Sequence, residues 1–510
     1  MILVLNLGLK SMRAIVFDDR GRRLLTAARP VHTFLEGDRI EQDPAEWRRL
    51  TLEVLAEATA NPAIRDALKA ITITTSACNL VCTAQDGSAL GRAMLVSDTR
   101  AATEATDLAT NPLFLSHAAT SGNLRAEPSM TLPRLLWLRN HDPARWNHSR
   151  FFLSSNAWLI AQLTGITITD PLNAEKSGFQ TSSNSYPAEL LDNLGIPAEK
   201  LAPVAPILST VGPLLPDIAA AAGLANRNIP VILTTYDAIC GVFGTAAGQQ
   251  GIACDVSGTV TSLRTISTSP PTGPLQGLFS QHIPSTGLHI VGGSNNLGGG
   301  LIEWVRQCFY ESNPDAYDAI ESDAATAGPG ADGLVFLPYL LGERAPLWDP
   351  TARGVFFGIE RRHGRPEMVR AVMESAACAM AWLRDALESL TGPIRSIRAT
   401  GGLARLRLVS QLKADILGVP VEITDEFEST ALGASLLCQL ATGSLSSLDD
   451  ASHCISIRET LEPNQSLGPF YQELLAFHRD LYSACRPLFS RRASLLPLLH
   501  ASQPVTVGNL

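Results

Sequence analysis

The same order of sequence patterns occurs twice along the chain, and this repetition is the strongest constraint on its fold. Near the N-terminus, apolar runs at residues 2–5 and 12–17 flank the turn NLGLKS, a pattern typical of a β-hairpin. A second strand–turn–strand pattern, GIACDVSGTVTSLRTIS, begins at Gly251. Strand-like and helix-like segments alternate after each hairpin, as they do in α/β folds. We therefore expect two related α/β domains with a cleft between them.

The length of the chain agrees with this division. Its 510 residues are too many for a single hydrophobic core. The small and polar stretch GTAAGQQG at residues 244–251 predicts the boundary, which gives domains at residues 1–246 and 247–485. Residues 486–510 are expected to form a short helix and a loose tail. Pro and Gly in residues 212–224, and Pro, Gly, Ser and Thr in residues 267–285, predict loops there.

Composition and charge exclude several classes of function. The formal net charge is −9 and the pI is about 5.6, which argues against a surface for nucleic acid or for an anionic membrane. No apolar stretch is long enough to predict a transmembrane helix, and no secretory signal is recognisable. The nine cysteines contain no C-x-x-C pair. We therefore expect a cytoplasmic protein with reduced thiols.

One acidic residue occupies a position at which catalysis is chemically reasonable. Asp237 stands where the apolar run VILTT gives way to the small-residue helix pattern AICGVFG. A carboxylate at the end of a strand, facing a cleft, can accept a proton from a substrate hydroxyl. Asp is also a favoured N-cap residue, and the local sequence alone favours that simpler role.

Several small-residue turns could contact phosphate groups. The stretch SGTVTS at residues 257–262 offers consecutive backbone N–H donors and two threonine hydroxyls. GGSNNLGGG and TGGLAR would let the backbone approach a ligand closely before a helix begins. Taken singly, each of these turns is equally compatible with an ordinary hairpin or helix start.

A longer block links these separate signals. FLPYLLGERAPLWDPTARGVFFGI, at residues 336–359, interleaves charged, aromatic and Pro residues without an amphipathic period. Together with five other segments, this block resembles the FGGY carbohydrate kinases, and the resemblance covers residues 2–437. The five segments occur in the same order as in that family: RIEQDPAEWRRL, YDAICGVFG, SGTVTS, TGGLARLRLVSQLKADILGVPV and STALGASLL. The xylulokinase-like branch is the most similar. The resemblance implies two actin-like domains of the ribonuclease H type, with sugar and ATP meeting in the interdomain cleft.

The resemblance also implies roles for individual residues. The γ-phosphoryl group of ATP would be transferred to a sugar hydroxyl with Mg²⁺ present, and Asp237 would be the catalytic base. Nucleotide contacts would come from Gly8, Lys10, Ser11, Gly258, Thr259, Gly299, Gly402 and Leu403. Sugar contacts would come from Asn79, Leu80, Asp98 and Arg100, together with Asp237.

The sequence departs from the family pattern at the first turn and on the sugar side. Asn6 stands where the family usually has Asp, and Leu9 and Lys10 replace two Thr. An amide can still hydrogen-bond a water on Mg²⁺ but adds no negative charge, so metal binding through Asn6 should be weak. Lys10 could instead bind phosphate directly or point to solvent. On the sugar side, SACNLV lacks a His expected of a xylulokinase-like chain, and the Trp–Asn expected before Asp98 is also missing. The sequence therefore leaves the identity of the acceptor open between a ketopentose and a related sugar or polyol.

Three functions remain to be separated. The first is an ATP-dependent sugar kinase, and the second is a catalytically weakened relative that binds nucleotide or sugar in a regulatory role. The third is an actin-like ATPase of the chaperone or filament type, against which the block GERAPLWDP argues. The oligomeric state stays open, a homodimer included.

Overall fold

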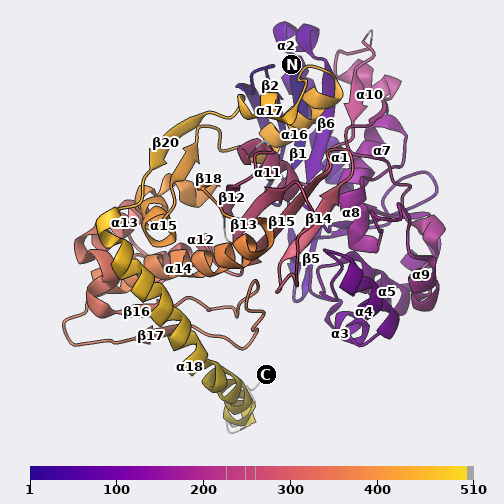
Figure 1. Ribbon diagram of the computed structural model, residues 1–510. Coiled ribbons are helices and arrows are strands. Elements are labelled where there is room, and N and C mark those ends of the chain that lie inside the picture. The colour runs from indigo at the N-terminus through magenta and orange to yellow at the C-terminus, as the bar shows by residue number, and fades with distance from the viewer. Residues whose placement is uncertain (226, 247, 259, 502–510) are drawn as a thin grey trace, which may run out of the picture.

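The computed structural model describes residues 1–225, 227–246, 248–258 and 260–501, with side chains described as far as residue 495. Two large mixed sheets dominate it, one from each half of the chain. In Figure 1 the N-terminal half, indigo to magenta, occupies the right-hand side, and most of the orange and yellow C-terminal half occupies the left, while α16 and α17 lie beside β2. The predicted alternation of strands and helices is present in both halves.

The N-terminal sheet has six strands in the order β10–β11–β6–β1–β2–β3. Its central strands β11, β6 and β1 are parallel, so their carboxyl ends lie at one edge of the sheet. Side chains alternate along β1: Leu3 and Leu5 pack against Trp47, whereas Ile2 and Val4 face the opposite helices. The strand bounds are β1 (Ile2–Leu7), β2 (Ser11–Phe17), β3 (Arg23–Pro30), β6 (Ala70–Thr75), β10 (Thr210–Pro213) and β11 (Pro230–Ile232).

The C-terminal sheet has seven strands in the order β14–β15–β13–β12–β18–β19–β20. Here β12, β18 and β19 are parallel, and their carboxyl ends again share one edge. The bounds are β12 (Ile252–Ser257), β13 (Thr261–Ser267), β14 (Phe279–Ile283), β15 (Leu288–Asn295), β18 (Ser396–Thr400), β19 (Val421–Thr424) and β20 (Ile457–Leu461).

Two helices join the sheets through a shared core. α11 (Asp237–Ala246) and α16 (Ser429–Ala441) pack against each other, and each contacts strands of the N-terminal sheet. α11 also packs on β12. One hydrophobic cluster accordingly contains Val4 from the first sheet, Cys254 from the second and Phe243 from α11. The close approach of the helices requires small residues, because a Cβ on Gly244 would lie 1.9 Å from the Ser429 carbonyl oxygen.

Further helices pack on the two large sheets or on one another. In the N-terminal half of the chain these are α1 (Pro44–Thr59), α2 (Pro62–Ala67), α7 (Ser155–Thr164) and α10 (Pro216–Ala221). In the C-terminal half of the chain they are α12 (Gly299–Phe309), α13 (Ala316–Ala327), α14 (Arg365–Thr391), α15 (Arg407–Leu417) and α17 (Leu448–Ser452). As predicted, Asp43 caps α1 through the Ala45 N–H, and Gly165 ends α7 in the left-handed conformation.

A smaller sheet and its helices extend the N-terminal half beside the cleft. The strand order is β4–β5–β8–β7–β9. The bounds are β4 (Phe34–Glu36), β5 (Arg39–Gln42), β7 (Leu80–Thr83), β8 (Ala93–Met94), β9 (Phe151–Ser154), α3 (Ala102–Leu108), α4 (Pro112–Thr120), α5 (Thr131–His141), α6 (Pro143–His148), α8 (Pro171–Ala174) and α9 (Ala188–Leu194). In the C-terminal half, β16 (Val335–Leu337) and β17 (Val355–Phe357) form a separate hairpin.

The structure corrects three expectations about irregular segments. Residues 212–224 contribute to β10 and form α10, and residues 267–285 include β14, which pairs with β15. The expected short C-terminal helix is instead the end of α18 (Gly468–Ala501), a single helix of 34 residues that extends away from the body in Figure 1. Residues 502–510 of the expected tail lie outside the described residues.

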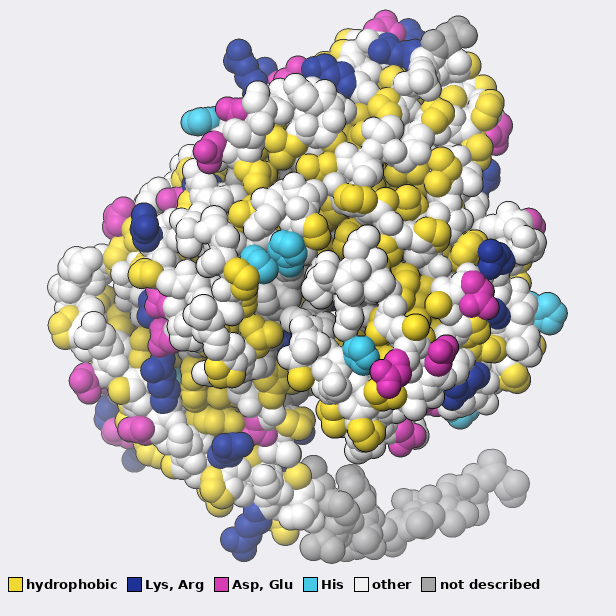
Figure 2. All heavy atoms as spheres, turned by 45° about the vertical axis from the view of Figure 1, so that its right-hand side comes forward, with side chains coloured by type: hydrophobic (Ala, Val, Ile, Leu, Met, Phe, Trp, Pro, Cys, Tyr) yellow, Lys and Arg dark blue, Asp and Glu magenta, His cyan; other side chains and the backbone are white. Residues whose placement is uncertain are grey.

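Two surface properties bear on the classes of partner. Within the described residues, no helix combines the length and the apolar character that crossing a bilayer requires. On the face shown in Figure 2, basic side chains are scattered among acidic ones and do not gather in one patch.

Candidate active site

The carboxyl edges of the two large sheets face each other. On the N-terminal side, β1 leads into the Gly8 turn, β6 leads to Ser76, and β11 is followed by Asp237. Two contacts tie the edges together: Arg13 Nη1 donates to Glu428 Oε1 at 2.6 Å, and Thr430 Oγ1 donates to the Asp237 carbonyl at 3.3 Å. The turns that the sequence singled out therefore meet at one site.

Asp237 is the first residue of α11, and its carboxylate is held by two donors. Oδ1 accepts the Ala238 N–H at 2.7 Å, and Oδ2 accepts the Ser76 hydroxyl at 3.1 Å. The residue is partly exposed, so the carboxylate is reachable. Burial raises the pKa of Asp237, while the Ala238 N–H, the Ser76 hydroxyl and the nearby Arg264 guanidinium lower it. This environment suits a proton acceptor.

A large cavity lies on the C-terminal side of the site, with a volume of about 910 Å³. It brings together five of the predicted nucleotide-binding residues: Lys10, Gly258, Gly299, Gly402 and Leu403. The sequence analysis did not select the polar groups of the remaining walls, which are Glu303 from α12, Tyr317, Asp318 and Glu321 from α13, and Arg405 from the 3₁₀ segment Gly402–Arg405. The size and the glycine-rich walls suit a nucleotide.

Gly299 shows why this wall needs a glycine. Its N–H donates to the Gly258 carbonyl at 2.8 Å, which fixes the start of α12 against the turn after β12. A Cβ at position 299 would lie 2.6 Å from the same oxygen, too close for any side chain. The N-terminus of α12 is thereby held at the cavity, where its free N–H groups favour phosphate. Thr259, predicted beside Gly258, lies outside the described residues.

A backbone hydrogen bond closes the first turn. The Gly8 N–H donates to the Ser11 carbonyl at 3.0 Å, and the Lys10 side chain is exposed and lines the cavity. Ser11 begins β2 and is not among the residues that line this cavity. Its predicted nucleotide contact therefore stays a prediction.

The donor set at this turn fits a Mg²⁺ ion that arrives with the nucleotide. Asn6 is 2% exposed, and its amide makes no hydrogen bond with another described residue. Among the described residues, no three His, Cys, Asp or Glu side chains group in a way that would hold a metal ion. Because Mg²⁺ keeps several waters and binds substrate phosphates, Asn6 could contact it through water without a preformed protein site.

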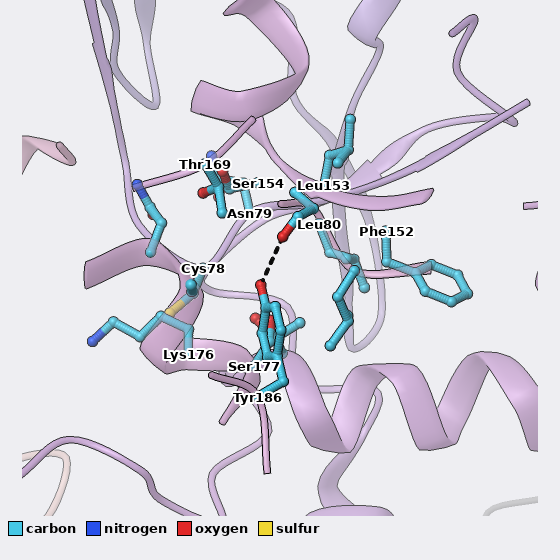
Figure 3. Close-up of a pocket in the computed structure, with 15 residues that line it drawn as sticks. Cys78, Asn79, Leu80, Phe152, Leu153, Ser154, Thr169, Lys176, Ser177 and Tyr186 are labelled. Carbon is cyan, nitrogen blue, oxygen red and sulfur yellow. Dashed lines mark hydrogen bonds between the residues drawn. The ribbon is translucent and has the colours of Figure 1, made fainter. Parts of the chain in front are cut away.

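Asn79 and Leu80, predicted to bind sugar, line a small closed pocket (Figure 3). Its volume of about 20 Å³ has room for a water but not for a sugar. The Asn79 amide is engaged by its neighbours, since Oδ1 accepts the Val96 N–H at 3.0 Å and Nδ2 donates to Ser155 Oγ at 3.3 Å. Their predicted sugar contact stays a prediction.

Asp98 and Arg100 form a buried ion network with Glu41. The Asp98 side chain is fully buried and accepts the Ile40 N–H at 2.9 Å and the Arg100 Nη2 at 2.6 Å. Arg100 also donates to Glu41 Oε1 at 2.6 Å. Because these groups satisfy one another, we expect them to hold the sugar-side loops in place more than to contact the acceptor.

Residues of the two halves also meet near Tyr236, which directly precedes Asp237. Gln281 Nε2 donates to Glu175 Oε2 at 2.7 Å, and the Tyr236 hydroxyl donates to Gln281 Oε1. The Ser280 N–H donates to the Gly122 carbonyl at 2.9 Å. Sequence reasoning missed these contacts, as well as Ser76 and Arg13, because each depends on segments far apart in the chain. The one available signal was the position of Ser76 directly after a buried strand.

Comparisons with known proteins agree with this geometry. The FGGY family of carbohydrate kinases matches with its N-terminal domain over residues 1–244 and with its C-terminal domain over residues 256–442. The glycerol kinase of Polaromonas naphthalenivorans (strain CJ2) is 30% identical over 491 residues, which cover 92% of this chain and 96% of that protein. The gluconokinase of Bacillus subtilis (strain 168) is 29% identical over 365 residues, 69% of this chain and 71% of that protein.

A solved structure shows the same architecture. The ligand-bound xylulose kinase from Lactobacillus acidophilus superimposes with a TM-score of 0.88 at 25% identity, covering 96% of this chain and all of that one. The actin-like, ribonuclease H-type fold expected from the sequence is thus confirmed, with its two domains. The chain belongs to the FGGY family of carbohydrate kinases.

Proposed function

We propose that this carbohydrate kinase transfers the γ-phosphoryl group of ATP to a hydroxyl of a small polyhydroxylated acceptor held beside Asp237. The observation that carries the proposal is the position of Asp237. It projects from the carboxyl edge of one sheet, hydrogen-bonded to Ser76, and the facing edge of the other sheet borders the large glycine-walled cavity.

The described residues provide the parts that such a transfer needs. ATP would occupy the 910 Å³ cavity, with its phosphates against the Gly258 turn and the N-terminus of α12. Asp237 would accept the proton of the acceptor hydroxyl as the phosphoryl group arrives. Lys10 would place a positive charge beside the phosphates. Mg²⁺, when bound to the nucleotide, neutralises part of the charge that develops on the phosphoryl oxygens.

The proposal also concerns the chemical identity of the acceptor. A ketopentose or a related sugar or polyol was expected from the sequence, and the names of the compared proteins add gluconate and glycerol. The His and Trp–Asn missing from the sugar-side segments argue against xylulose itself.

A direct test measures ADP release from ATP with a panel of ketopentoses, aldonates, glycerol and longer polyols. We expect acceptor-dependent ADP release by the wild-type protein that is lost in Asp237→Asn. Folding of the variant would be checked by thermal unfolding. Release of ADP that does not depend on any acceptor, or activity that survives Asp237→Asn, would contradict the proposal. A folded wild-type protein that is inactive on every acceptor would favour the regulatory alternative.

A further inference from the structure

A heptad repeat of mostly apolar residues runs along the last helix, α18. Leucine recurs at every seventh position: Leu474, Leu481, Leu488 and Leu495. Four residues before each leucine stands a second series: Phe470, Phe477, Ala484 and Arg491. Pro487 belongs to neither series. Spacings that alternate between three and four residues are typical of the seam of a coiled coil, which is buried against a second helix.

The body of the protein covers the first half of this seam and leaves the second half exposed. Leu481 belongs to a buried cluster with Tyr482, and Leu474 packs against the same cluster. Leu488 and Leu495 are 58% and 56% exposed, in the part of α18 that extends away from the body in Figure 1. Phe489 still packs in the cluster, so Leu488 faces away from the body. Packing within one chain therefore does not account for the repeat beyond Leu481.

A second exposed apolar surface lies beside the first half of the helix. Phe470 and Phe477, one heptad apart, are both exposed. The ring centroid of Phe357 in β17 lies 5.7 Å from that of Phe477, and the exposed Ile359 follows two residues later. We call these four side chains the proximal patch. One molecule thus carries both a projecting leucine seam and an apolar surface, the proximal patch, on which such a seam could pack.

The exposed charges of α18 divide at its middle. The proximal half, residues 468–485, exposes Glu473 and Asp480, and its one arginine, Arg479, pairs with Asp385. The distal half, residues 486–501, has no acidic residue in its sequence and exposes three arginines: Arg486, Arg491 and Arg492. Two such helices attract each other when they are antiparallel, because acidic and basic halves then face each other. A basic amphipathic helix can also lie on an anionic membrane, but a membrane would match the distal half alone and would repel Glu473 and Asp480.

We infer that two copies of this chain form a twofold-symmetric dimer in which the α18 helices pack antiparallel, the distal half of each on the proximal patch of the other. Pairing the leucine series with the second series sets Leu495 opposite Phe477 of the second copy and Asp480 level with Arg492 of the second copy. Each contact then occurs twice, and the pairing closes on itself without leaving a seam for further copies. The inference does not depend on the proposed kinase function.

Sedimentation equilibrium of the full chain over a range of concentrations tests the dimer. We expect a mass of twice the chain mass of 54.5 kDa. The double variant Leu488→Glu/Leu495→Glu should raise the dissociation constant of the dimer by at least about 100-fold, because it places four charges per dimer in an apolar seam. Thermal unfolding of the same samples gives a second measurement. The unfolding temperature of the wild type should rise with protein concentration, and that of the variant should not.

Matched variants test the surface and the orientation of the helices. Leu35→Glu changes an exposed leucine of β4 in the other half of the chain and should leave the dissociation constant unchanged. Two charge reversals, Arg491→Glu/Arg492→Glu and Glu473→Lys/Asp480→Lys, should each weaken the dimer. Combining all four substitutions should restore it, since acidic and basic halves again face each other. A parallel pair predicts no such rescue.

Three results would overturn the inference. The first is a wild-type protein that stays monomeric at every concentration, and the second is a dimer that survives Leu488→Glu/Leu495→Glu. The third is a dimer that the leucine variant disrupts but that the four combined charge reversals do not restore, because the helices would then not be antiparallel. Co-sedimentation with vesicles of phosphatidylcholine and phosphatidylserine covers the membrane alternative. A monomeric wild type that binds these vesicles, and loses binding in the leucine variant, would assign the seam to a membrane surface instead.

Discussion

Ser76 Oγ lies 3.1 Å from Asp237 Oδ2 and donates a hydrogen bond to it across 161 positions of the sequence. The two residues meet because β6 and β11 are parallel neighbours, which places the segments after them at one edge of the sheet. The bond fixes the direction of the Asp237 carboxylate and stabilises its charged form. Two predictions follow from this pair.

Replacing Asp237 with Asn should lower kcat by about 10²- to 10⁴-fold, because an amide cannot accept the proton of the acceptor hydroxyl. The KM for ATP should change little, since the nucleotide cavity is lined by other residues. Steady-state kinetics with the best acceptor of the panel would measure both values. Ser76→Ala, which keeps the carboxylate, is the matched control and should cost far less in kcat. An equal loss in the two variants would show that Asp237 is not the base.

The Ser76 bond should also be visible in the pH dependence of the reaction. A base acts when it is deprotonated, so kcat/KM should fall as the pH drops through the pKa of Asp237, which burial raises above its usual value. The Ser76 hydroxyl lowers that pKa, so Ser76→Ala should move the acidic limb of the profile to higher pH. An unchanged limb would mean that another group controls it.

The parts of the fold that depend on local sequence were predictable, and those that depend on distant pairing were not. The hairpin of β1 and β2, the Asp43 cap and the Gly165 helix end each follow from a few adjacent residues. β14 could not be recognised, because its Ser- and Gly-rich surroundings indicate a loop until β15 is there to pair with it.

In the candidate active site, too, local features were predictable from the sequence and long-range contacts were not. Gly258, Gly299 and Gly402 stood out as turns before helices, and the structure brings all three to one cavity. The contact between Ser76 and Asp237 has no local signature, because it joins segments 161 positions apart. For the same reason the sequence could not reveal that Asp98 and Arg100 satisfy each other in a buried ion network.

Glu175 should make the stability of the protein depend on pH. Its pKa is raised from 4.5 to about 7 in the folded protein, so the folded state prefers the protonated form. Below about pH 4.5 the group is protonated in both the folded and the unfolded states and costs nothing. As the pH rises from about 4.5 to about 7, the folded state loses up to about 3 kcal/mol relative to the unfolded state, and the loss is constant at higher pH.

Glu175→Gln removes this charge while keeping an oxygen that can accept from Gln281. The variant should therefore be more stable than the wild type at pH 8, and the difference should shrink as the pH falls toward 5. Urea unfolding at several pH values would measure it. A stability difference that does not change with pH would contradict the raised pKa.

The first turn should determine how much Mg²⁺ the reaction needs. Asn6→Asp replaces an amide with a carboxylate at the first turn, so the Mg²⁺ concentration that gives the half-maximal rate should fall several-fold.

Lys10→Met tests the phosphate contact of the same turn. It should raise the KM for ATP and leave the KM for the acceptor unchanged, because Lys10 lines the nucleotide cavity. Kinetics at varied Mg²⁺ and ATP would test both variants. No response to either would place the phosphates away from this turn.

A buried ion pair supports the turn that faces the phosphates. Lys413 Nζ in α15 donates to Asp255 Oδ2 at 2.5 Å and to Ser257 Oγ at 3.0 Å, directly before Gly258. Both charged side chains are nearly inaccessible, so removing one leaves the other unpaired. Lys413→Met should lower the free energy of unfolding by about 3–5 kcal/mol.

The double variant Lys413→Met/Asp255→Leu tests whether the loss comes from the stranded charge. It should recover most of the stability, because a buried pair replaced by apolar groups costs little. It should still raise the KM for ATP, since Ser257 loses the two charged partners that hold the turn in place. Urea unfolding and ATP kinetics of the same three proteins separate the two effects. A double variant as unstable as Lys413→Met would show that packing, and not charge, accounts for the loss.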